Sequence, residues 1–481
     1  MESFKRLGLS KPILKVIEEL GFEKPSQIQE LAIPQIIQGN RDFIGLAQTG
    51  TGKTAAFGWP LLERIDPSLH YTQGLILAPT RELGQQIAGQ IEVFSKFMDQ
   101  VNVLAVYGGA SIVDQIRALR KPQHIIIATP GRLIDLIKRK SVKLDKLKFL
   151  VLDEADEMLN MGFKEDLDTI LEYTPEEKVV WLFSATMSPE IRRIVKTYME
   201  HPAEVKLNVE NEVNANILHQ FAVVKQSDKS EALTRFLDVD PDIRGVVFCR
   251  TRQDTQDLAD LLLKKNYRAE ALHGDLSQKQ RDRVMDLFKR KALQVLIATD
   301  IAARGIDVND LTHVFHVSLP DDLSYYTHRS GRTARAGKKG ISLAIINVHE
   351  REKLHRISKS LDIQFQQVLV PQTREVYSLK VENWCRGILD KPGKNAIEAK
   401  LLEKASLLFG SLSKEELIAK LLTTEIEKWN VGANVDLNFD FSKPAGGKGS
   451  SMHKPSQPKK TFSSGKRSFS KKKTYGKRPV G

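Results

Sequence analysis

Short apolar runs alternate with helix-length segments between about residue 40 and residue 350, and this alternation limits what the chain can fold into. Uninterrupted apolar runs of this length are typical of strands buried on both faces, which occur in parallel sheets covered by helices. The runs are 74–79, 124–130, 149–153, 181–186, 245–250, 269–274, 294–300, 313–320 and 341–347. The two halves also echo each other, because Ala-Thr ends an apolar run in both IIIATPGR (125–132) and VLIATDIAARG (295–305). The pattern predicts an α/β fold with two parallel-sheet lobes in tandem.

A different kind of sequence follows Pro371. Apolar residues recur at helical spacing in EAKLLEKASLLFGSL (398–412), and Ser413 with Glu416 matches a capping box for a second helix. Between the lobes, the polar stretch NVENEVNANI (208–217) carries few strong structural signals and is typical of a linker. The predicted parts are a first lobe, a linker, a second lobe, a small helical extension and a tail, at 1–207, 208–218, 219–370, 371–441 and 442–481.

Basic residues are concentrated in the predicted tail. Residues 442–481 contain twelve Lys and Arg and no Asp or Glu. Removing these twelve from the 73 basic residues of the chain leaves 61 against 60 acidic ones, so the net charge of +13 belongs almost entirely to the tail. Phe462, Phe469 and Tyr475 lie between its cations. This composition predicts a segment that is disordered when free and that binds nucleic acid through cations and stacking rings, with a purely solvating tail as the alternative.

Cysteine usage and hydropathy indicate the compartment. The chain has two cysteines, Cys249 and Cys385, which disfavours a disulfide framework or a zinc cluster and fits a reducing cytosol. No apolar run approaches the ~18 residues that a bilayer-spanning helix needs. The N-terminal sequence lacks the apolar core and cleavage site of a signal peptide. We therefore expect a cytoplasmic protein with no membrane partner.

A glycine-rich sequence, AQTGTGKT (47–54), separates a strand-like segment from a helix-like one. In such a loop, backbone N–H groups surround phosphates, the lysine reaches the β- and γ-phosphates, and the final hydroxyl binds Mg²⁺. Ala47 stands where the general pattern has Gly. The loop predicts a nucleotide site formed by Gln48, Thr49, Gly50, Thr51, Gly52, Lys53 and Thr54, with Thr54 as a ligand of Mg²⁺.

An acidic sequence, FLVLDEAD (149–156), ends another buried run. In phosphoryl-transfer sites, an aspartate at the end of a strand holds Mg²⁺. Asp153 fits that role, and Glu154 is placed to orient or deprotonate an attacking water. Acidic clusters at strand ends are also common as solvated turns. Together with Lys53, the sequence predicts hydrolysis of a nucleoside triphosphate.

The second half contributes HRSGRTARAG (328–337), in which Arg329, Arg332 and Arg335 recur every three residues. This spacing places them on one side of a helical turn. A solvated basic face is one interpretation, but glycines are costly in a merely solvated helix. An arginine supplied by another lobe accelerates phosphoryl transfer by roughly 10³–10⁵. The second interpretation therefore assigns Arg332 and Arg335 to catalysis.

Taken in order, these motifs resemble those of DEAD-box ATP-dependent RNA helicases, and in particular bacterial cold-shock-type members. The resemblance covers about residues 4–347 and implies two RecA-like lobes, ATP and Mg²⁺ as cofactors, and RNA as substrate. GFEKPSQIQ (21–29) resembles the family's Q motif. By this resemblance Gln29 reads adenine and Phe22 or Phe4 packs near the base, while Gly305 and Asp307 complete the ATP site, Asp307 at the ribose.

Other motifs resemble the family's RNA-contacting and coupling residues. They are PTREL (79–83), Gly108-Gly109, TPGR (129–132), VVFCRT (246–251), Gln278 with Arg281, and ATDIAARGID (298–307). The resemblance implies sequence-independent contacts to the RNA backbone from Pro79, Thr80, Arg81, Gly108, Gly109, Thr129, Pro130, Gly131, Arg132, Arg250, Gln278, Arg281, Thr299 and Arg304. It also implies that nucleotide state is coupled to unwinding through Asp156, Ser184, Thr186, His328 and Arg329.

The resemblance implies an RNA-stimulated ATPase whose lobes close on ATP and RNA, so that one strand of a short duplex is gripped and the other leaves. An ATP-gated RNA clamp or scaffold is an alternative from a different class, and a DNA translocase is a weaker one. The preference for RNA rests on the resemblance, because reading of the 2′-OH cannot be seen in the motifs. Family members suggest ribosome biogenesis, RNA degradation and cold shock as processes, with ribosomal precursors or RNA-decay proteins as partners. For the extension, a dimerisation module and packing on the second lobe both remain open.

Overall fold

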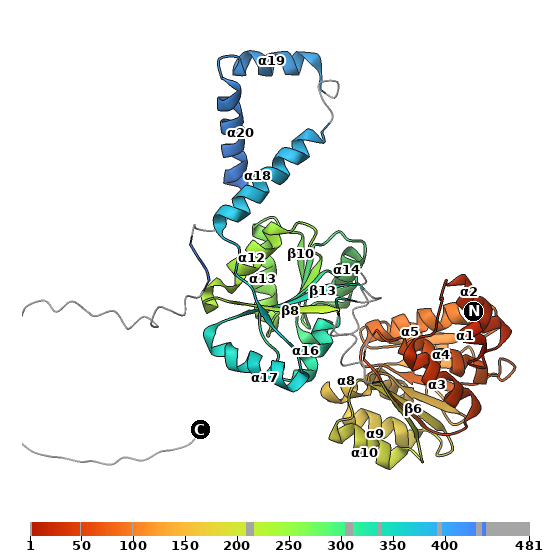
Figure 1. The fold of residues 1–481 in the computed structure, drawn as a ribbon. Helices are drawn as coiled ribbons and strands as arrows, with labels where there is room; N and C mark the ends of the chain where they lie inside the picture. The colour runs from red at the N-terminus through yellow and green to blue at the C-terminus, as the bar shows by residue number, and fades with distance from the viewer. Residues whose placement is uncertain are drawn as a thin grey trace, which may run out of the picture. The chain divides into compact units, whose positions relative to one another are not determined.

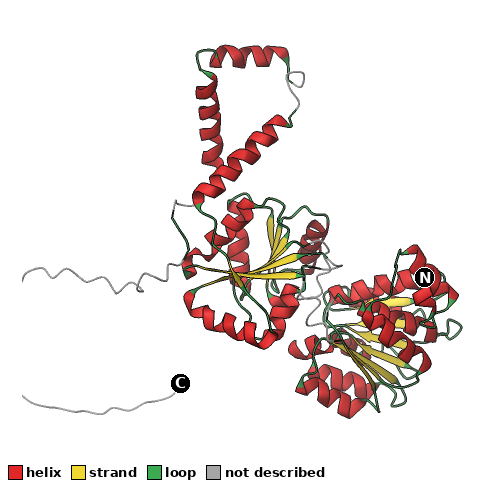
Figure 2. Cartoon of the chain, viewed as in Figure 1, coloured by secondary structure: helices red, strands yellow, loops and turns green. Residues whose placement is uncertain are grey.

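The computed structural model describes residues 2–48, 50–98, 100–207, 216–303, 311–334, 338–391, 397–429 and 435–438. Two α/β lobes follow one another along the chain, and helices lie on both faces of each sheet (Figures 1 and 2). Every strand pairing in both sheets is parallel. The predicted fold class is therefore confirmed.

The sheet of the first lobe has the strand order β3-β4-β2-β5-β6-β1-β7. Side chains alternate between two apolar layers: Leu75 and Leu77 face one layer and Ile76 faces the other. Burial on both faces explains why the central strands read as continuous apolar runs. The strands are β1 (Phe43–Leu46), β2 (Gly74–Leu77), β3 (Val103–Val106), β4 (Ile125–Ala128), β5 (Phe149–Leu152), β6 (Val179–Ser184) and β7 (Ala203–Lys206).

Several helices of the first lobe begin within the motifs. Thr80 caps α5 by accepting a hydrogen bond from the Leu83 N–H at 3.2 Å, and Pro130 occupies the first turn of α7. The helices are α1 (Glu2–Lys5), α2 (Lys11–Glu19), α3 (Gln27–Gln38), α4 (Lys53–Arg64), α5 (Arg81–Phe94), α6 (Ile112–Leu119), α7 (Pro130–Lys138), α8 (Ala155–Asn160), α9 (Lys164–Tyr173) and α10 (Pro189–Tyr198).

The second lobe repeats this plan with the strand order β10-β11-β9-β12-β13-β8-β14. Its strands are β8 (Ile217–Val223), β9 (Gly245–Phe248), β10 (Ala269–Leu272), β11 (Val295–Ala298), β12 (His313–His316), β13 (Gly340–Ile346) and β14 (Gln366–Gln367). Its helices are η1 (Gln226–Asp228), α12 (Lys229–Val239), α13 (Arg252–Lys264), α14 (Gln278–Lys289), α15 (Asp300–Ala303), α16 (Leu323–Ser330), η3 (Val348–Glu350) and α17 (Arg351–Leu361). Strand β8 begins before the end of the range 208–218 predicted as linker, and residues 208–215 lie outside the described residues.

The extension contains α18 (Thr373–Leu389), α19 (Ala399–Phe409) and α20 (Lys414–Trp429). The capping box predicted for α20 is confirmed: Ser413 N–H donates to Glu416 Oε2 at 2.8 Å, and Glu416 N–H donates to Ser413 Oγ at 3.1 Å. The rings of Tyr377 and Trp429 lie 6.5 Å apart, which brings the start of α18 to the end of α20. Within the described residues, no helix has the length and apolar character needed to cross a bilayer.

After α20 the chain returns to the second lobe at Leu437 and Asn438. Leu437 is buried in an apolar cluster of that lobe together with Val370. The Val370 N–H donates to Asn438 Oδ1 at 2.7 Å, and Asn438 Nδ2 donates to Val370 O at 3.1 Å. We call Val370, Leu437 and Asn438 the clasp. It joins the residue before the extension to two residues near the end of the extension; the range 442–481 lies outside the described residues.

Candidate active site

The residues predicted to bind nucleotide and those predicted to bind RNA follow different strands of the first sheet. Lys53 follows β1, Asp153 follows β5 and Ser184 ends β6, and these strands are neighbours in the order β5-β6-β1. Thr80 and Thr129 follow β2 and β4 in the other half, which has the order β3-β4-β2. Because the strands are parallel, all these loops emerge at the carboxyl edge of the sheet. The edge therefore carries two adjacent groups of predicted site residues.

The loop before α4 has the backbone of a phosphate cradle. Gly50 and Gly52 have φ angles of 88° and 92°, a left-handed conformation that glycine adopts without cost. A Cβ on Gly52 would lie 2.5 Å from Gln29 Nε2, so the loop also needs glycine there for close approach. Lys53 is buried, and its Nζ donates to Ala47 O at 3.0 Å. The Lys53 side chain therefore bonds back to the start of the loop. The Thr51 hydroxyl adds a second hydrogen bond within the loop by donating to Gln48 O at 2.8 Å.

The predicted adenine-reading segment packs directly against this loop. Gln29 Nε2 donates to Gly52 O at 3.2 Å, while its Oε1 accepts from the Ser26 N–H at 2.9 Å. Phe4 is completely buried and meets the ring of Trp59 edge-on at 5.9 Å. Phe22 contacts the same indole but is 42% exposed, so of the two predicted rings only Phe22 offers surface to a base. The adenine contact of Gln29 stays a prediction.

The acidic sequence lies at the end of β5 and is buried. Burial raises the pKa of Asp153 to about 7, although the charge of Lys53 acts in the opposite direction. Glu154 has φ 49° and ψ 50°, and this left-handed conformation costs a non-glycine residue about 1–2 kcal/mol. Strain of this kind persists where the surrounding structure enforces it, often at functional sites. The Glu154 N–H donates to Asp153 Oδ1 at 3.0 Å, directly after the end of β5.

Asp156 connects the acidic sequence to the residues Ser184 and Thr186 at the end of β6. Its Oδ2 accepts from both the backbone N–H and the hydroxyl of Thr186 at 3.0 Å. The Ser184 hydroxyl in turn donates to Thr186 O at 2.8 Å. The contact gives Asp156, Ser184 and Thr186 the physical connection that their predicted coupling role needs; the role itself stays a prediction.

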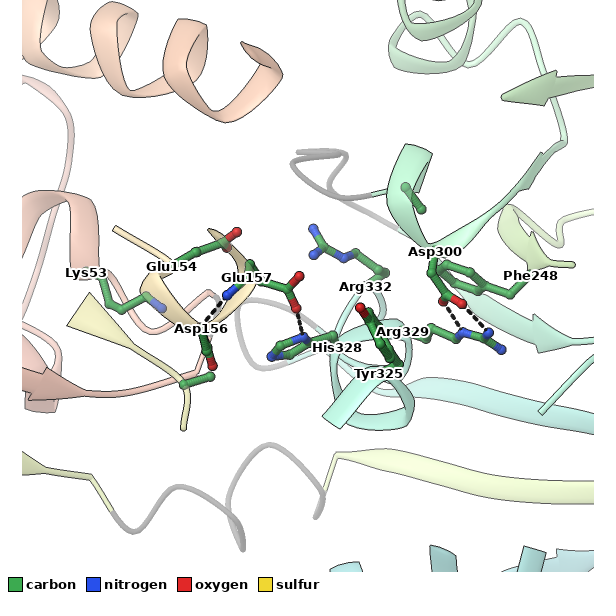
Figure 3. A pocket seen from close by; sticks show the side chains of 12 residues that line it. Lys53, Glu154, Asp156, Glu157, Phe248, Asp300, Tyr325, His328, Arg329 and Arg332 are labelled. Atoms are coloured by element: carbon green, nitrogen blue, oxygen red, sulfur yellow. Dashed lines mark hydrogen bonds and ion pairs between the residues drawn. The ribbon is translucent and has the colours of Figure 1, made fainter. Parts of the chain in front are cut away.

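Residues of both lobes line one pocket, as the twelve side chains that surround it show. In Figure 3, Arg332 extends from the second lobe toward the side of the pocket that carries Glu154 and Glu157. The first lobe contributes Lys53, Glu154, Asp156, Glu157 and Ala185, and the second contributes Phe248, Asp300, Ala303, Tyr325, His328, Arg329 and Arg332. The pocket therefore brings three predicted catalytic residues together.

Two side chains of α16 differ in what they contact. His328 Nδ1 lies 2.5 Å from Glu157 Oε1 across the pocket. Arg329 is buried instead and forms a two-pronged ion pair, with Nε 2.5 Å from Asp300 Oδ1 and Nη2 2.7 Å from Asp300 Oδ2 (Figure 3). Its guanidinium also lies 4.9 Å from the centre of the Phe248 ring. Arg329 therefore anchors α16, whereas His328 faces the first lobe.

The ion pair of His328 gives a pH dependence. Burial alone would lower the pKa of His328, but the hydrogen bond and charge of Glu157, with the charges of Asp156 and Glu154, raise it above the ordinary 6.5. A histidine whose folded-state pKa is raised contributes stability below its unfolded pKa and loses it as pH rises through the folded pKa. We expect His328→Gln to lower stability at about pH 6 by about 1.5–3 kcal/mol, the range for hydrogen bonds to charged groups, and to have little effect in alkali.

Urea midpoints of the two proteins, taken from mildly acidic to alkaline pH, measure this difference. His355→Gln removes an exposed histidine from α17 and serves as the control, with a small effect at every pH. If His328→Gln lowers stability by the same amount at every pH, the ion pair between a protonated His328 and Glu157 is not the cause.

The predicted RNA-contacting residues of the first lobe are partly held by one another. Arg81 Nη1 donates to Gly108 O at 3.4 Å, and a Cβ on Gly109 would lie 2.7 Å from that nitrogen. Arg132 Nη1 donates to Gln115 Oε1 at 2.8 Å. Both guanidinium groups are therefore held at the β3-β4-β2 half of the carboxyl edge.

In the second lobe, the predicted RNA residues follow β9, β10 and β11, which again are neighbours. Arg250 pairs with Asp321 at 3.4 Å, and Thr299 is buried at the end of β11. Contacts also join α14 to α5: Arg281 lies 3.1 Å from Glu82 Oε1, and Asp282 lies 3.1 Å from Arg81 Nη2. Gln278 Nε2 donates to Asp282 Oδ1 at 2.6 Å. Basic and acidic side chains thus meet where RNA phosphates are predicted to bind.

Some of the predicted site residues lie outside the described residues, and some pocket residues were not predicted. Outside the described part are Thr49, Arg304, Gly305, Asp307 and Arg335. Sequence reasoning did not assign Glu157, Phe248, Asp300 or Tyr325, which line the pocket. Asp300 and Phe248 sit within quoted motifs, so motif position was the available signal for them. Glu157 follows the acidic sequence by one residue, and only its pairing with His328 distinguishes it.

Residues 26–194 match the DEAD/DEAH box helicase family, and residues 228–337 match the helicase conserved C-terminal domain. The DEAD-box ATP-dependent RNA helicase CshA of Geobacillus kaustophilus (strain HTA426) is 41% identical over 420 residues, which is 87% of each chain. This chain belongs to the DEAD-box ATP-dependent RNA helicases. The predicted family and enzyme class, an RNA-dependent ATPase, are thereby confirmed, as is the use of ATP.

Other relatives of this DEAD-box protein agree in both sequence and structure. The ATP-dependent RNA helicase CshA of Limosilactobacillus reuteri is 41% identical over 422 residues, 87% of this chain and 84% of that one. The structure of S. cerevisiae Dbp5 bound to RNA and ADP BeF3 matches with a TM-score of 0.72 and 32% identity, covering 80% of this chain and 99% of the Dbp5 chain. The bacterial relatives bear the name CshA, which agrees with the predicted cold-shock-type resemblance.

Proposed function

We propose that the shared pocket is the ATPase site and that hydrolysis there drives local separation of short RNA duplexes and remodelling of RNA–protein complexes. The observation that supports this most is the meeting of Lys53 and Glu154 with Arg332 in one pocket (Figure 3). Lys53 holds the β- and γ-phosphates, Glu154 orients and deprotonates the attacking water, and Arg332 stabilises charge on the transferred phosphoryl group. Arg335, proposed for the same role as Arg332, lies outside the described residues. Turnover then requires residues of both lobes.

The strand-end residues fit a magnesium ion that is bound together with the nucleotide. Mg²⁺ in such sites takes one or two protein ligands and completes its shell with phosphate oxygens and water. Asp153 supplies a buried carboxylate at the end of β5, and Thr54 supplies a hydroxyl in the first turn of α4. Mg²⁺, when bound, neutralises charge on the β- and γ-phosphates. Burial raises the pKa of Asp153, and a cation bound beside it would lower that pKa by stabilising the carboxylate.

RNA binding at the β3-β4-β2 edge and at the matching edge of the second lobe would couple the two sites. Guanidinium and backbone groups there suit a sugar-phosphate strand read without regard to sequence. RNA that contacts both lobes would favour lobe closure, and closure places Arg332 against the nucleotide. Release of a strand from a short RNA duplex, compared with the lifetime of the protein on single-stranded RNA, tests this proposal. Long retention with ATP but no strand release would favour the clamp, and stronger stimulation by DNA than by RNA would favour a DNA translocase.

Asp282 occupies a place that we assign to an RNA phosphate. Its Oδ1 contacts both Arg81 and Gln278, so RNA must displace this carboxylate. The Asp282 side chain is 61% exposed, and exposed ion pairs contribute only about 0.2–1 kcal/mol. We expect Asp282→Asn to raise RNA affinity by about 1.4- to fivefold, which is that energy converted to an equilibrium constant. Fluorescence anisotropy with a labelled single strand at low salt measures the change.

Asp286→Asn is the matched control, because it removes the same charge from the same helix. Asp286 pairs with Arg290 at 2.9 Å and not with a predicted RNA-contacting residue. If both variants strengthen RNA binding equally, the gain is a general charge effect and the displacement proposal is wrong.

For the extension, we propose a homodimer through residues 371–441. Its support is the number of exposed apolar side chains on α19, where Leu401, Leu407 and Leu408 are 60%, 78% and 72% exposed. Such a surface is typical of an interaction site. Only Thr373 and Val376 of α18 are buried, so packing of the described extension on the second lobe leaves most of its apolar surface uncovered.

Sedimentation at micromolar concentration tests the dimer. We expect the wild type to sediment as a dimer and Leu401→Glu/Leu408→Glu to sediment as a monomer, because charges desolvated in an apolar interface are costly. Ser406→Glu adds a charge to the same helix at a polar position and should leave the dimer intact. A wild-type monomer would reject the proposal.

The remaining proposals rest on composition and resemblance. We propose that residues 442–481 anchor RNA through their cations and rings. We also propose a cytoplasmic role, with ribosomal precursors or RNA-decay proteins as partners. Crosslinking of RNA to the protein in cells would identify these targets.

A further inference from the structure

A buried polar network underlies α16 in the second lobe. The hydroxyl of Ser342, on β13, is its centre: Oγ lies 2.9 Å from His316 Nε2, 3.2 Å from the Tyr326 hydroxyl and 2.9 Å from Ser330 Oγ. Ser342 and His316 are fully buried, and so is Tyr326. The network extends to His219 on β8, whose Nδ1 lies 2.8 Å from the Tyr326 hydroxyl. Strands β8, β12 and β13 are therefore tied to one helix by hydrogen bonds.

The network also reaches the anchor of α16. His316 Nδ1 lies 3.5 Å from Arg329 Nη1, and Arg329 Nη1 donates to Ser318 O at 2.6 Å. Because an arginine side chain can only donate, His316 Nδ1 accepts from Arg329. His316 Nε2 then carries the hydrogen and donates a hydrogen bond to the Ser342 hydroxyl. The ring of His316 stacks on Tyr326 at 4.8 Å. One set of donors and acceptors thus connects β13 to Arg329.

Helix α16 presents two faces that differ in function. Tyr326 and Ser330, at helical spacing, point into the network, while Arg329 contacts the network and also lines the pocket. Tyr325 and His328 line the pocket, and Arg332 lines it from the turn that follows, where its N–H bonds Arg329 O at 3.0 Å. Any rotation or sliding of the inner face moves the outer one, because a helix is stiff over this length. The network is therefore connected to Arg332 through α16.

Stability alone does not account for such an inner face. A buried hydroxyl or imidazole loses its hydration, and replacing a satisfied polar set by apolar groups of the same shape is often close to neutral. Apolar packing alone, however, tolerates alternative arrangements before stability is lost. Directional hydrogen bonds to three strands define one register for α16.

We propose that Tyr326, Ser342 and His316 are positioning residues of the ATPase, which hold α16 so that Arg332 meets the nucleotide. The proposal rests on the proposed function of Arg332, and it goes beyond it by naming the residues that place the guanidinium. Ser342 and Tyr326 do not line the pocket and contact the reaction only through α16. Their loss should change turnover and leave ATP and RNA binding almost unchanged.

Ser342→Ala removes the centre of the network, and Tyr326→Phe removes one hydroxyl while keeping the ring. A misplacement of about 1 Å can reduce turnover by about 10²-fold. We expect RNA-stimulated kcat to fall by about tenfold in Ser342→Ala and by about threefold in Tyr326→Phe, with KM for ATP and RNA affinity within about twofold. Turnover is normalised to the ATP-binding fraction, so that loss of folded protein does not imitate a loss of kcat.

Tyr267→Phe is the matched control. The Tyr267 hydroxyl donates to Asp238 at 2.7 Å in the same lobe, away from α16. It should change thermal stability but not kcat. If Tyr326→Phe and Tyr267→Phe lower stability alike and neither changes kcat, the network is only structural and the proposal is wrong.

A double mutant separates this proposal from the proposed function. If the network acts through Arg332, Ser342→Ala should reduce kcat little further in an Arg332→Lys protein, because the two changes disrupt one unit. Multiplying effects would overturn the positioning role while leaving the arginine's role intact. If Arg332→Lys has a normal kcat, the proposed catalytic role of Arg332 is wrong, and the positioning proposal that depends on it is wrong too.

Discussion

Glu154→Gln is expected to reduce RNA-stimulated ATP hydrolysis by about 10²–10⁴, the usual contribution of a general base. Gln keeps the size of the side chain and has the same left-handed backbone to satisfy, so the turn after β5 should survive. ATP and RNA binding should remain within about twofold, because Glu154 acts on water and not on the phosphates or the strand. Steady-state phosphate release, with anisotropy of a labelled RNA in the presence of ATP, measures both properties.

Glu165→Gln on α9 is the control, since it makes the same chemical change at an exposed site of the same lobe. It should retain full turnover. Near-normal ATPase activity in Glu154→Gln would remove Glu154 from the mechanism. Loss of ATP binding instead would show that its carboxylate shapes the nucleotide site.

Arg332→Lys is expected to lower kcat by about 10³, the lower end of the range for an arginine finger. Lysine keeps the positive charge but lacks the planar fork that binds two phosphoryl oxygens at once. KM for ATP should change little, because the contact forms mainly in the transition state. Single-turnover hydrolysis with saturating RNA measures the chemical step without product release.

Arg356→Lys, at an exposed position on α17, makes the same exchange away from the pocket and should be silent. A fall in RNA affinity that accounts for the whole effect of Arg332→Lys would contradict the catalytic assignment. A fall in kcat with RNA affinity preserved would support it.

The contiguous parts of the site could be predicted from sequence. The loop before α4 and the acidic end of β5 carry their chemistry within a few residues, and local backbone conformation places it. The pairing of His328 with Glu157 could not be predicted, because it depends on how two separate lobes bring distant residues together. The burial of Phe4 could not be predicted either, because its partner Trp59 lies far along the chain in the same lobe.

Strands β3, β7 and β8 were not predicted from the sequence, and each has a physical reason. Strand β3 is only partly buried and β7 alternates buried and exposed residues, so neither reads as a continuous apolar run. Strand β8 contains His219, a buried polar residue whose Nδ1 lies 2.8 Å from the Tyr326 hydroxyl. The polar sequence of β8 argued against a buried strand, although the strand is buried beside the network under α16. Sequence rules are expected to fail at functional sites, and we propose that this network is one.

The clasp makes the extension an insertion that leaves the second lobe and returns to it at one point. Val370 and Asn438 hold each other, so the residues between them leave the second lobe and come back to the same point. Helices in this interval could be lengthened, exchanged or lost without moving Asn438 away from Val370. Whatever the extension binds, Asn438 stays tied to Val370 on the lobe that carries Arg332.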